Sequence, residues 1–330
     1  METRTLAGPP RHAALLFKTA AEFAACVRDY VLTGGDPLPA LVAATQPRLE
    51  ALSRSRAPDR IRLANLAVVG TDPGRVLGMI RQFADEHGGA VRCVQEVAWP
   101  GRPGDELAEA VRLEPLIDLA LATAPVSVLC AYDATLGPAA TRAAGHAHHA
   151  LLRDGRWQVG QLASERQAAW PGEFDGERQV DAADLRVDGD VADGQDPAAL
   201  PRLPEPAATL RYREDQAAVR AVTAQRARAA GLSPDRVTDL VIAVGELAAN
   251  TLAHTRGSGT LAIWSTSTEV ICQVSDTGRI ADPLAGTLQP GPGSARRGRG
   301  LWVVHQLCDL VQLRTGQSGT TVRLHMRLDG

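Results

Sequence analysis

The sequence lacks several features that would place it in a specialised class of protein. Its five cysteines are odd in number, widely scattered and never spaced as Cys-x-x-Cys, which argues against a disulfide framework and against a zinc site. We therefore expect a protein of the reducing cytoplasm. The longest apolar run, over residues 116–132, is broken by Asp118 and Pro125 and is too short to cross a membrane.

A strong excess of charge is also missing. The 330 residues carry a formal net charge of −3, from 35 basic and 38 acidic side chains. No basic patch stands out, so we expect no direct nucleic-acid binding and no attraction to an anionic membrane. The first ten residues carry an acidic Glu2 and no apolar stretch, so no signal peptide is expected. A hydrophobic content of 45% and a charged content of 22% are ordinary for a soluble globular protein.

Composition divides the chain into three parts. Residues 1–160 alternate helical stretches with short apolar runs, which indicates an α/β domain with a mostly parallel sheet. Residues 161–206 are rich in Asp, Gly and Pro and cannot bury enough apolar surface to offset their ordering entropy, so they are predicted to be a flexible acidic linker. Residues 207–330 predict helices on one face of a mixed sheet, an α+β sandwich.

Local signals predict the elements of the first part. Apolar spacing over residues 20–33 predicts a helix that ends at Gly34 and Gly35, and a second amphipathic helix is predicted over residues 72–87. The β-branched runs at 61–69 and 125–132 predict two strands, the second of them buried.

The second part has clearer boundaries. Ser233 followed by Pro234 is a favoured helix start, and the helix is predicted to run to about Thr255. An amphipathic helix over residues 214–231 precedes it. Strands are predicted at 208–212, 260–266, 269–276, 311–315 and 320–326, and a helix at 301–310.

A polar stripe runs along the helix that begins at Ser233. Glu246, Asn250 and His254 recur every four residues, so they share one helical face. Such a stripe either faces water or lines a cavity. Taken alone, it is most simply a solvated surface.

Three later segments favour a cavity. The motif SDTG places Asp276 at the end of an apolar strand, where its carboxylate can accept a hydrogen bond. The motif GRGL places Gly298 and Gly300 where the chain enters a helix, so that free N–H groups and the helix dipole can meet phosphates. The motif SGTT places a hydroxyl, that of Thr320, at the start of the last strand.

In this order the four segments resemble the ATP-binding fold shared by gyrase, Hsp90, histidine kinases and MutL. They more closely resemble its variant in the serine kinases that act as anti-sigma factors. The resemblance covers about residues 209–328. It is carried by Glu-xxx-Asn, Asp-x-Gly, a Gly-x-Gly-Leu that ends at Leu301, and Gly-Thr.

The resemblance implies ATP and Mg²⁺ as cofactors and a role for each matched residue. Asn250 would be the magnesium ligand, Glu246 the general base, Asp276 with Gly278 the adenine site, Gly298, Gly300 and Leu301 the edge of a phosphate lid, and Thr320 a support for the adenine. One carboxamide oxygen is enough, because Mg²⁺ keeps several waters and takes phosphate oxygens. His254 receives no role, and Arg297 replaces a glycine usual in the lid.

The first part offers fewer chemical groups. Cys130, Tyr132 and Asp133 lie at the end of a predicted strand, where open α/β sheets place ligand groups. A free cysteine is, however, more often a small buried apolar side chain. The adjacent pair His148 and His149 cannot easily chelate one ion, and no well-spaced ligand set accompanies it, so we expect no metal here.

Residues 12–155 resemble the MEDS sensory domain, whose name refers to methanogen, methylotroph and DcmR sensors. The family's Cys-Pro-Tyr-Asp appears here as Cys-Ala-Tyr-Asp at residues 130–133. The resemblance implies a ligand-sensing relative of the RecA/KaiC-like α/β fold. Since the chain has no Walker A loop and only one lysine, Lys18, we expect no ATP binding by this domain.

These resemblances together favour a cytoplasmic signalling regulator. It would be an ATP-binding anti-sigma factor that phosphorylates an anti-anti-sigma partner on serine under control of the sensory domain. Members of the ATPase family commonly pair, so a homodimer is compatible with this interpretation. Two alternatives stay open: a non-catalytic, nucleotide-gated module that sequesters a sigma factor, and a protein like a sensor histidine kinase. The last is disfavoured because the linker occupies the place of a phosphoacceptor helix.

Overall fold

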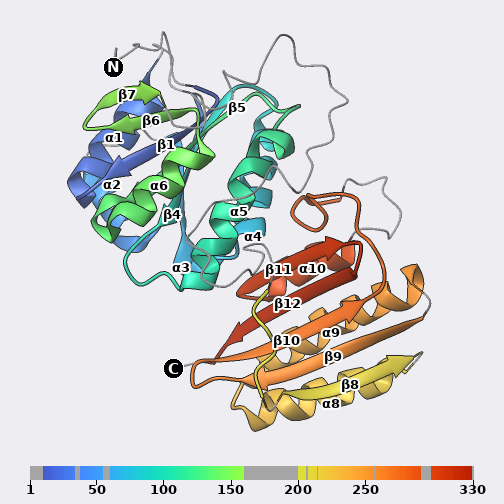
Figure 1. Ribbon diagram of the computed structural model, residues 1–330. Helices are drawn as coiled ribbons and strands as arrows, with labels where there is room; N and C mark the ends of the chain where they lie inside the picture. The colour runs from blue at the N-terminus through green and yellow to red at the C-terminus, as the bar shows by residue number, and fades with distance from the viewer. Residues whose placement is uncertain are drawn as a thin grey trace. The chain divides into compact units, whose positions relative to one another are not determined.

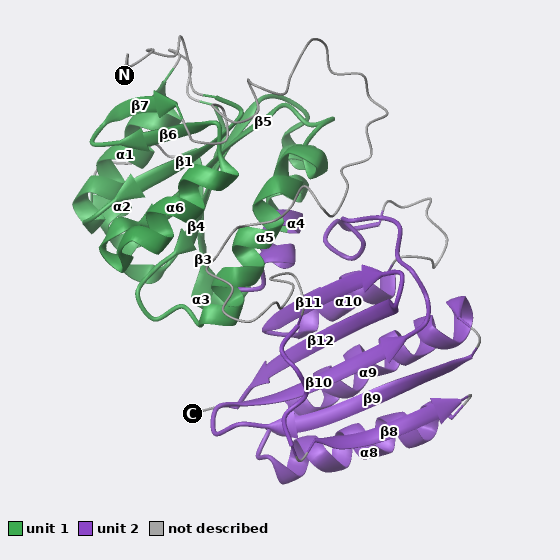
Figure 2. Ribbon diagram, viewed as in Figure 1, with its two compact units in different colours: residues 1–70, 79–190 green, residues 71–78, 191–330 purple. Residues whose placement is uncertain are grey.

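The computed structural model describes residues 10–33, 38–54, 60–159, 200–205, 207–213, 215–255, 257–290 and 299–328. The chain forms two compact units, one of residues 1–70 and 79–190 and the other of residues 71–78 and 191–330 (Figure 2). Most of the predicted linker lies outside the described residues, as do Gly34, Gly35, Arg297 and Gly298. Within the described ranges, no helix is both long and apolar enough to cross a membrane.

The first unit is built on a seven-stranded sheet in the order β3-β2-β4-β5-β1-β6-β7 (Figure 1). All neighbouring strands are parallel except β6 and β7, which confirms the prediction of a mostly parallel sheet. The strands are β1 (His12–Phe17), β2 (Ala40–Ala44), β3 (Ile61–Asn65), β4 (Val91–Ala98), β5 (Val126–Asp133), β6 (Ala150–Arg153) and β7 (Arg156–Val159). The helices are α1 (Ala20–Leu32), α2 (Gln46–Arg54), α3 (Leu66–Val69), α4 (Pro73–His87), of which residues 79–87 belong to this unit, α5 (Gly104–Ala120) and α6 (Pro138–Ala147).

Burial of the central strands explains their composition. All residues of β1 and β2 are buried, as expected for parallel strands covered on both faces. Helix α1 packs Phe23, Val27 and Val31 into one core cluster with side chains of β1 and β2. Helices α5 and α6 are in contact with each other, and they contact β4 and β5 respectively. The prediction that β5 is buried is confirmed.

One predicted strand is wrong in its second half. Residues 61–69 form β3 only as far as Asn65, and residues 66–69 turn into the short helix α3. The Asn65 side chain accepts a hydrogen bond from the N–H of Ala67 at 3.0 Å, which caps the helix. This local capping outweighs the strand preference of Val68 and Val69, and Val68 is 81% exposed.

The second unit is a five-stranded sheet in the order β11-β12-β10-β9-β8, with its helices on one face (Figure 1). Its elements are β8 (Ala208–Arg213), α8 (Gln216–Ala229), α9 (Pro234–His254), β9 (Ser258–Ser265), β10 (Glu269–Asp276), α10 (Arg299–Leu307), β11 (Leu310–Gly316) and β12 (Gly319–Arg327). Every neighbouring pair of strands is antiparallel. The prediction of a mixed sheet was therefore wrong. Helix α9 contacts α8, α10 and the central strands, so it forms the middle of the helical layer.

The sequence signals at the ends of α9 are confirmed. Ser233 occupies the N-cap position and Pro234 the first turn, and the helix ends at His254. Ser233 stands there without a side-chain capping hydrogen bond. The apolar face of α9 buries Leu240, Val244 and Leu247 in the core, which leaves its polar stripe on a different side.

Candidate functional site

The polar stripe of α9 lies against the start of α10. Glu246 and Asn250 are half-buried, and Gly300 is the second residue of α10. A methyl group at Gly300 would lie 2.8 Å from Glu246 Oε2 and 3.3 Å from Asn250 Nδ2. The carboxylate, the carboxamide and the glycine therefore meet, although 50 residues separate Asn250 from Gly300 in the chain. Among the described residues, the side chains of Glu246 and Asn250 have no hydrogen-bond partner, so both are available to a ligand.

Asp276 forms a second part of the site at the end of β10. Its Oδ1 accepts a hydrogen bond from the N–H of Gly278 at 2.7 Å, and its Oδ2 accepts one from the Thr251 hydroxyl at 2.7 Å. These two bonds fix the plane of a half-buried carboxylate. Each carboxylate oxygen can accept further hydrogen bonds, so Asp276 keeps acceptor capacity for an amino group.

Thr251 joins the two parts, and the sequence analysis missed it. It directly follows Asn250 on α9 and is buried. Its hydroxyl accepts a hydrogen bond from Tyr212 at 3.0 Å and lies 3.1 Å from the carbonyl oxygen of Leu247. Burial raises the pKa of Tyr212, so its phenol keeps the proton that it donates. A threonine beside the asparagine, five residues after Glu246, was the only available signal.

Thr320 and Gly319 support the turn that follows Asp276. Thr320 pairs with Asp276 across β10 and β12, and its hydroxyl donates to the carbonyl oxygen of Gly278 at 2.9 Å. Gly319 has φ of +120°, and a Cβ there would clash with the carbonyl oxygen of Asp276. Only glycine fits where the two strands approach this closely. The Gly-Thr pair thus positions the segment that carries Asp276 and Gly278.

The remaining predicted residues have separate positions. Leu301 is buried and belongs to the core beneath α10. His254 is exposed in the last turn of α9, where an imidazole can interact with the helix dipole. Gly298 lies outside the described residues. The structure therefore brings together Glu246, Asn250 and Gly300, and joins them through Thr251 to Asp276, Gly278 and Thr320.

This arrangement fits the magnesium salt of a nucleoside triphosphate. Space without a Cβ at Gly300 faces one carboxylate and one carboxamide, and an amide oxygen is a ligand that Mg²⁺ accepts. Gly300 lies in the first turn of α10, and the backbone N–H groups of a first helical turn have no partner within the helix and can bind phosphate. The fixed carboxylate of Asp276 offers an acceptor for the exocyclic amine of a purine.

In the first unit, the residues at the end of β5 that the sequence analysis selected as possible ligand groups are buried. Cys130 and Asp133 are buried, and Asp133 binds Arg48 at 2.6 Å between Oδ2 and Nη2. His148 is buried too, whereas His149 is exposed. The side chains around His148 come from parts of the chain that are far from it in the sequence.

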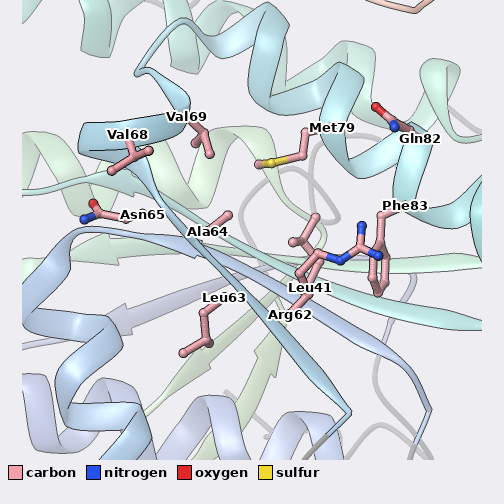
Figure 3. Close-up of a pocket in the computed structure, with 10 residues that line it drawn as sticks. All are labelled: Leu41, Arg62, Leu63, Ala64, Asn65, Val68, Val69, Met79, Gln82 and Phe83. Atoms are coloured by element: carbon pink, nitrogen blue, oxygen red, sulfur yellow. The ribbon is translucent and has the colours of Figure 1, made fainter.

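The first unit also has a hollow of about 420 Å³ beside β3 (Figure 3). Figure 3 shows Arg62 and Phe83 next to each other on one side of it, with the Arg62 guanidinium 5.0 Å from the ring centre. The lining is largely apolar: Leu41, Arg62, Leu63, Ala64, Asn65, Val68, Val69, Met79, Gln82 and Phe83. None of the candidate residues from the sequence lines this hollow.

Comparisons with known proteins agree with both sequence resemblances. Residues 210–326 match the family model described as a histidine kinase-like ATPase domain, and residues 11–150 match that of the MEDS sensory domain. The ATPase match implies ATP binding, usually with Mg²⁺. No curated protein matches the chain.

Among solved structures, one match is the crystal structure of the RsbU and RsbW domains of Rv1364c from Mycobacterium tuberculosis. It is 20% identical, covers 38% of this chain and 34% of that one, and has a TM-score of 0.30. This chain therefore spans about a third of the length of that neighbour, and a likeness this low supports no argument about function.

Proposed function

We propose that this chain, which matches a MEDS sensory domain in one half and a histidine kinase-like ATPase domain in the other, is an ATP-binding regulator of the anti-sigma type. In this proposal residues 1–160 form a ligand-sensing domain with a RecA/KaiC-like fold, and residues 207–330 form the GHKL-type ATPase sandwich. Residues 161–206 are the linker that joins the two domains. The partner is an anti-anti-sigma protein, which the second domain phosphorylates on serine in the cytoplasm.

The observation that carries the proposal is the meeting of Gly300 with Glu246 and Asn250. A methyl carbon at position 300 would lie only 2.8 Å from Glu246 Oε2, so the start of α10 can approach Glu246 and Asn250 this closely only because this residue is glycine. Asp276 lies one hydrogen bond from Thr251, the neighbour of Asn250. Four segments far apart in the sequence thus supply groups for a nucleotide base, its phosphates and a metal ion.

Each residue then has a chemical task. Asn250 contributes its amide oxygen to the ion, and Asp276 accepts a hydrogen bond from the adenine amino group. Glu246 accepts the proton of a serine hydroxyl while that oxygen forms a bond to the γ-phosphorus and the bond to the β,γ-bridging oxygen breaks. ADP leaves with the bridging oxygen. Bound Mg-ATP supplies the phosphoryl group.

A phosphohistidine mechanism has less support. No histidine occurs between His149 and His254, so neither the linker nor α8 supplies a phosphoacceptor histidine directly before the domain. His254 itself is the last residue of α9 and is exposed. We therefore expect no acid-labile phosphate on this chain after incubation with ATP.

The test is transfer of label from γ-³²P-ATP with Mg²⁺ to purified anti-anti-sigma domains encoded in the same genome. We expect acid-stable label on one of them, reduced at least about 100-fold by Glu246→Gln, because loss of a general base costs 10²–10⁴-fold. Asp235→Asn, an exposed carboxylate on the same helix, is the matched control and keeps the wild-type rate.

Absence of transfer to every domain, together with equal behaviour of the Glu246→Gln variant, would contradict the kinase. Binding of a sigma factor in a pull-down that neither ATP nor Asn250→Ala changes would instead support sequestration without a nucleotide switch. Nucleotide binding itself is measured by thermal unfolding, since Mg-ATP at a hundred times its dissociation constant stabilises a domain by about 2.7 kcal/mol.

A further inference from the structure

Four metal-binding side chains meet in the interior of the first unit. They are His12, at the start of β1, Glu114 on α5, Cys130 in β5, and His148, which caps the end of α6. All four are buried, with at most 8% of any residue exposed. One donor atom from each lies within 4.8 Å of the other three. The proposed ATPase site has no part in this cluster.

The outer nitrogen of each imidazole is occupied by an acceptor. His148 Nδ1 lies 2.9 Å from the carbonyl oxygen of Ala144, and a carbonyl only accepts, so this nitrogen carries the proton. His12 Nδ1 faces Asp118 Oδ1 at 3.4 Å. A carbonyl or carboxylate on the outer nitrogen is the usual support of a metal-binding histidine, because it fixes the ring and leaves Nε2 free to bind.

The four atoms that face the centre of the cluster lie close together, and each can donate a lone pair to a metal ion. Glu114 Oε2 lies 3.2 Å from His12 Nε2 and 3.0 Å from His148 Nε2, and Cys130 Sγ lies 3.4 Å from His12 Nε2. His148 Nε2 is buried and lies 3.0 Å from Glu114 Oε2 without the geometry of a hydrogen bond. Because Nδ1 already carries a proton, a lone pair on Nε2 facing a buried carboxylate oxygen would be costly, so a second proton or a metal ion belongs between these atoms.

These separations match the edges of a zinc tetrahedron. Zn–N and Zn–O bonds of about 2.0–2.1 Å place two ligand atoms roughly 3.3 Å apart, and a Zn–S bond of about 2.3 Å places them slightly further. Three of the six edges are 3.0, 3.2 and 3.4 Å in the structure, at or slightly below these values, and the ligand atoms of the other edges lie within 4.8 Å of one another. We propose that His12, Glu114, Cys130 and His148 bind one zinc ion as a closed, structural site.

The surroundings complete the site. Gln95 directs its amide nitrogen to Cys130 Sγ at 3.3 Å and to Glu114 Oε1 at 3.5 Å, so it donates to two of the ligands from outside. A thiolate and a carboxylate together neutralise the charge of Zn²⁺, as burial requires. Four protein ligands leave no open position, which is typical of structural rather than catalytic zinc.

Protons are the competing occupant. In the metal-free protein, burial lowers the pKa of His12, but Cys130, Asp118 and Glu114 together raise it well above its ordinary value. Burial raises the pKa of the Cys130 thiol to about 12, with Glu114 adding to the rise. A protonated imidazole beside Glu114 would therefore hold the cluster together without metal, and the experiment must separate the two occupants.

The first measurement is the zinc content of the full-length chain, purified without chelators and with any affinity tag removed. We expect about one equivalent of zinc per chain by plasma mass spectrometry. The second is replacement of zinc by Co²⁺, which reports the ligands of the wild-type protein without any mutation. A thiolate-to-cobalt charge-transfer band and the intense visible bands of a tetrahedral ion are expected.

Variants assign the ligands. Cys130→Ser and His148→Ala should each lower the zinc content below about 0.1 equivalent, and the charge-transfer band should vanish in Cys130→Ser. The matched controls are Cys93→Ser, a buried thiol on the neighbouring strand β4, and His149→Ala, the exposed neighbour of His148. Both controls keep the zinc.

Two results would overturn the proposal. One is a wild-type chain that contains no zinc when isolated and shows no Co²⁺ spectrum after addition of the ion, which would leave protons as the occupant. The other is full zinc content in both Cys130→Ser and His148→Ala. Because the cobalt spectrum needs no variant, a failure of either variant to fold does not affect the first of these outcomes.

Discussion

Replacement of Gly300 by alanine separates the stability of the second unit from its proposed chemistry. Gly300 is the second residue of α10, and alanine favours a helix over glycine by up to about 1 kcal/mol. For a unit of this size that gain corresponds to a rise in Tm of roughly 4 °C. On stability alone, Gly300→Ala should thus be neutral or favourable.

The same methyl group would disturb the proposed site. It would lie 2.8 Å from Glu246 Oε2 and 3.3 Å from Asn250 Nδ2, whereas unbonded carbon atoms settle at about 3.5–4.0 Å. Both contacts are to the ends of side chains, which can retreat by roughly half an ångström without unfolding the protein. Since a misplacement of about 1 Å can cost 100-fold in rate, we expect phosphoryl transfer to fall about 10-fold or more.

The assay pairs label transfer and Mg-ATP affinity with thermal unfolding. Gly245→Ala is the control, because it also adds a methyl group to a helix of the same unit but meets only Arg220, at 4.0 Å. It should gain stability and keep activity. If Gly300→Ala transfers phosphate and binds Mg-ATP within twofold of the wild type, the assignment of this space to the nucleotide is refuted.

Three further outcomes are expected. Gly319→Ala should destabilise the second unit by about 1–3 kcal/mol in urea unfolding, because φ of +120° and a clash of the added Cβ with the Asp276 carbonyl oxygen exclude a side chain; an unchanged midpoint would contradict this close approach of the two strands. Thr251→Val should weaken Mg-ATP binding about 10-fold by isothermal titration, since Asp276 loses a hydrogen bond, while Thr238→Val, a threonine exposed on the same helix, leaves affinity unchanged. The native chain should resist a thiol reagent at pH 8, because all five cysteines are buried, whereas denaturation should expose all five; rapid native labelling would show that the cores open readily.

The sequence predicted α9 and β10 of the second unit well because their signals are local. Ser233 and Pro234 mark the start of α9, and the apolar run before Asp276 marks the end of β10, so both the helix and the strand were placed closely. Thr251 was missed because its role depends on β8 and β10, the strands that bring Tyr212 and Asp276 to its hydroxyl. Nothing in the order of residues says that its hydroxyl meets Asp276 rather than water.

The first unit shows two limits of sequence analysis. The amide of Asn65 ends a strand that β-branched residues would have continued, and one side-chain hydrogen bond decides between the two structures. His12 and His148 are 136 positions apart, and they meet because β1 lies between β5 and β6 in the sheet. The expectation of no metal considered only how potential ligands are spaced along the chain. The order of the strands brings together side chains that are far apart in the sequence, which this spacing does not reveal.

Two hydrogen bonds, from Tyr212 to Thr251 and from Thr251 to Asp276, connect an edge strand of the sheet to the proposed ligand site. Tyr212 lies on β8, one of the two edge strands of the sheet, which have a neighbour on one side only and are therefore prone to fraying. When β8 separates, the Thr251 hydroxyl loses the donor that orients it toward Asp276. A ligand held by Asp276 should in turn slow amide exchange along β8, so that occupancy of the proposed site can be measured at the strand that follows the predicted linker.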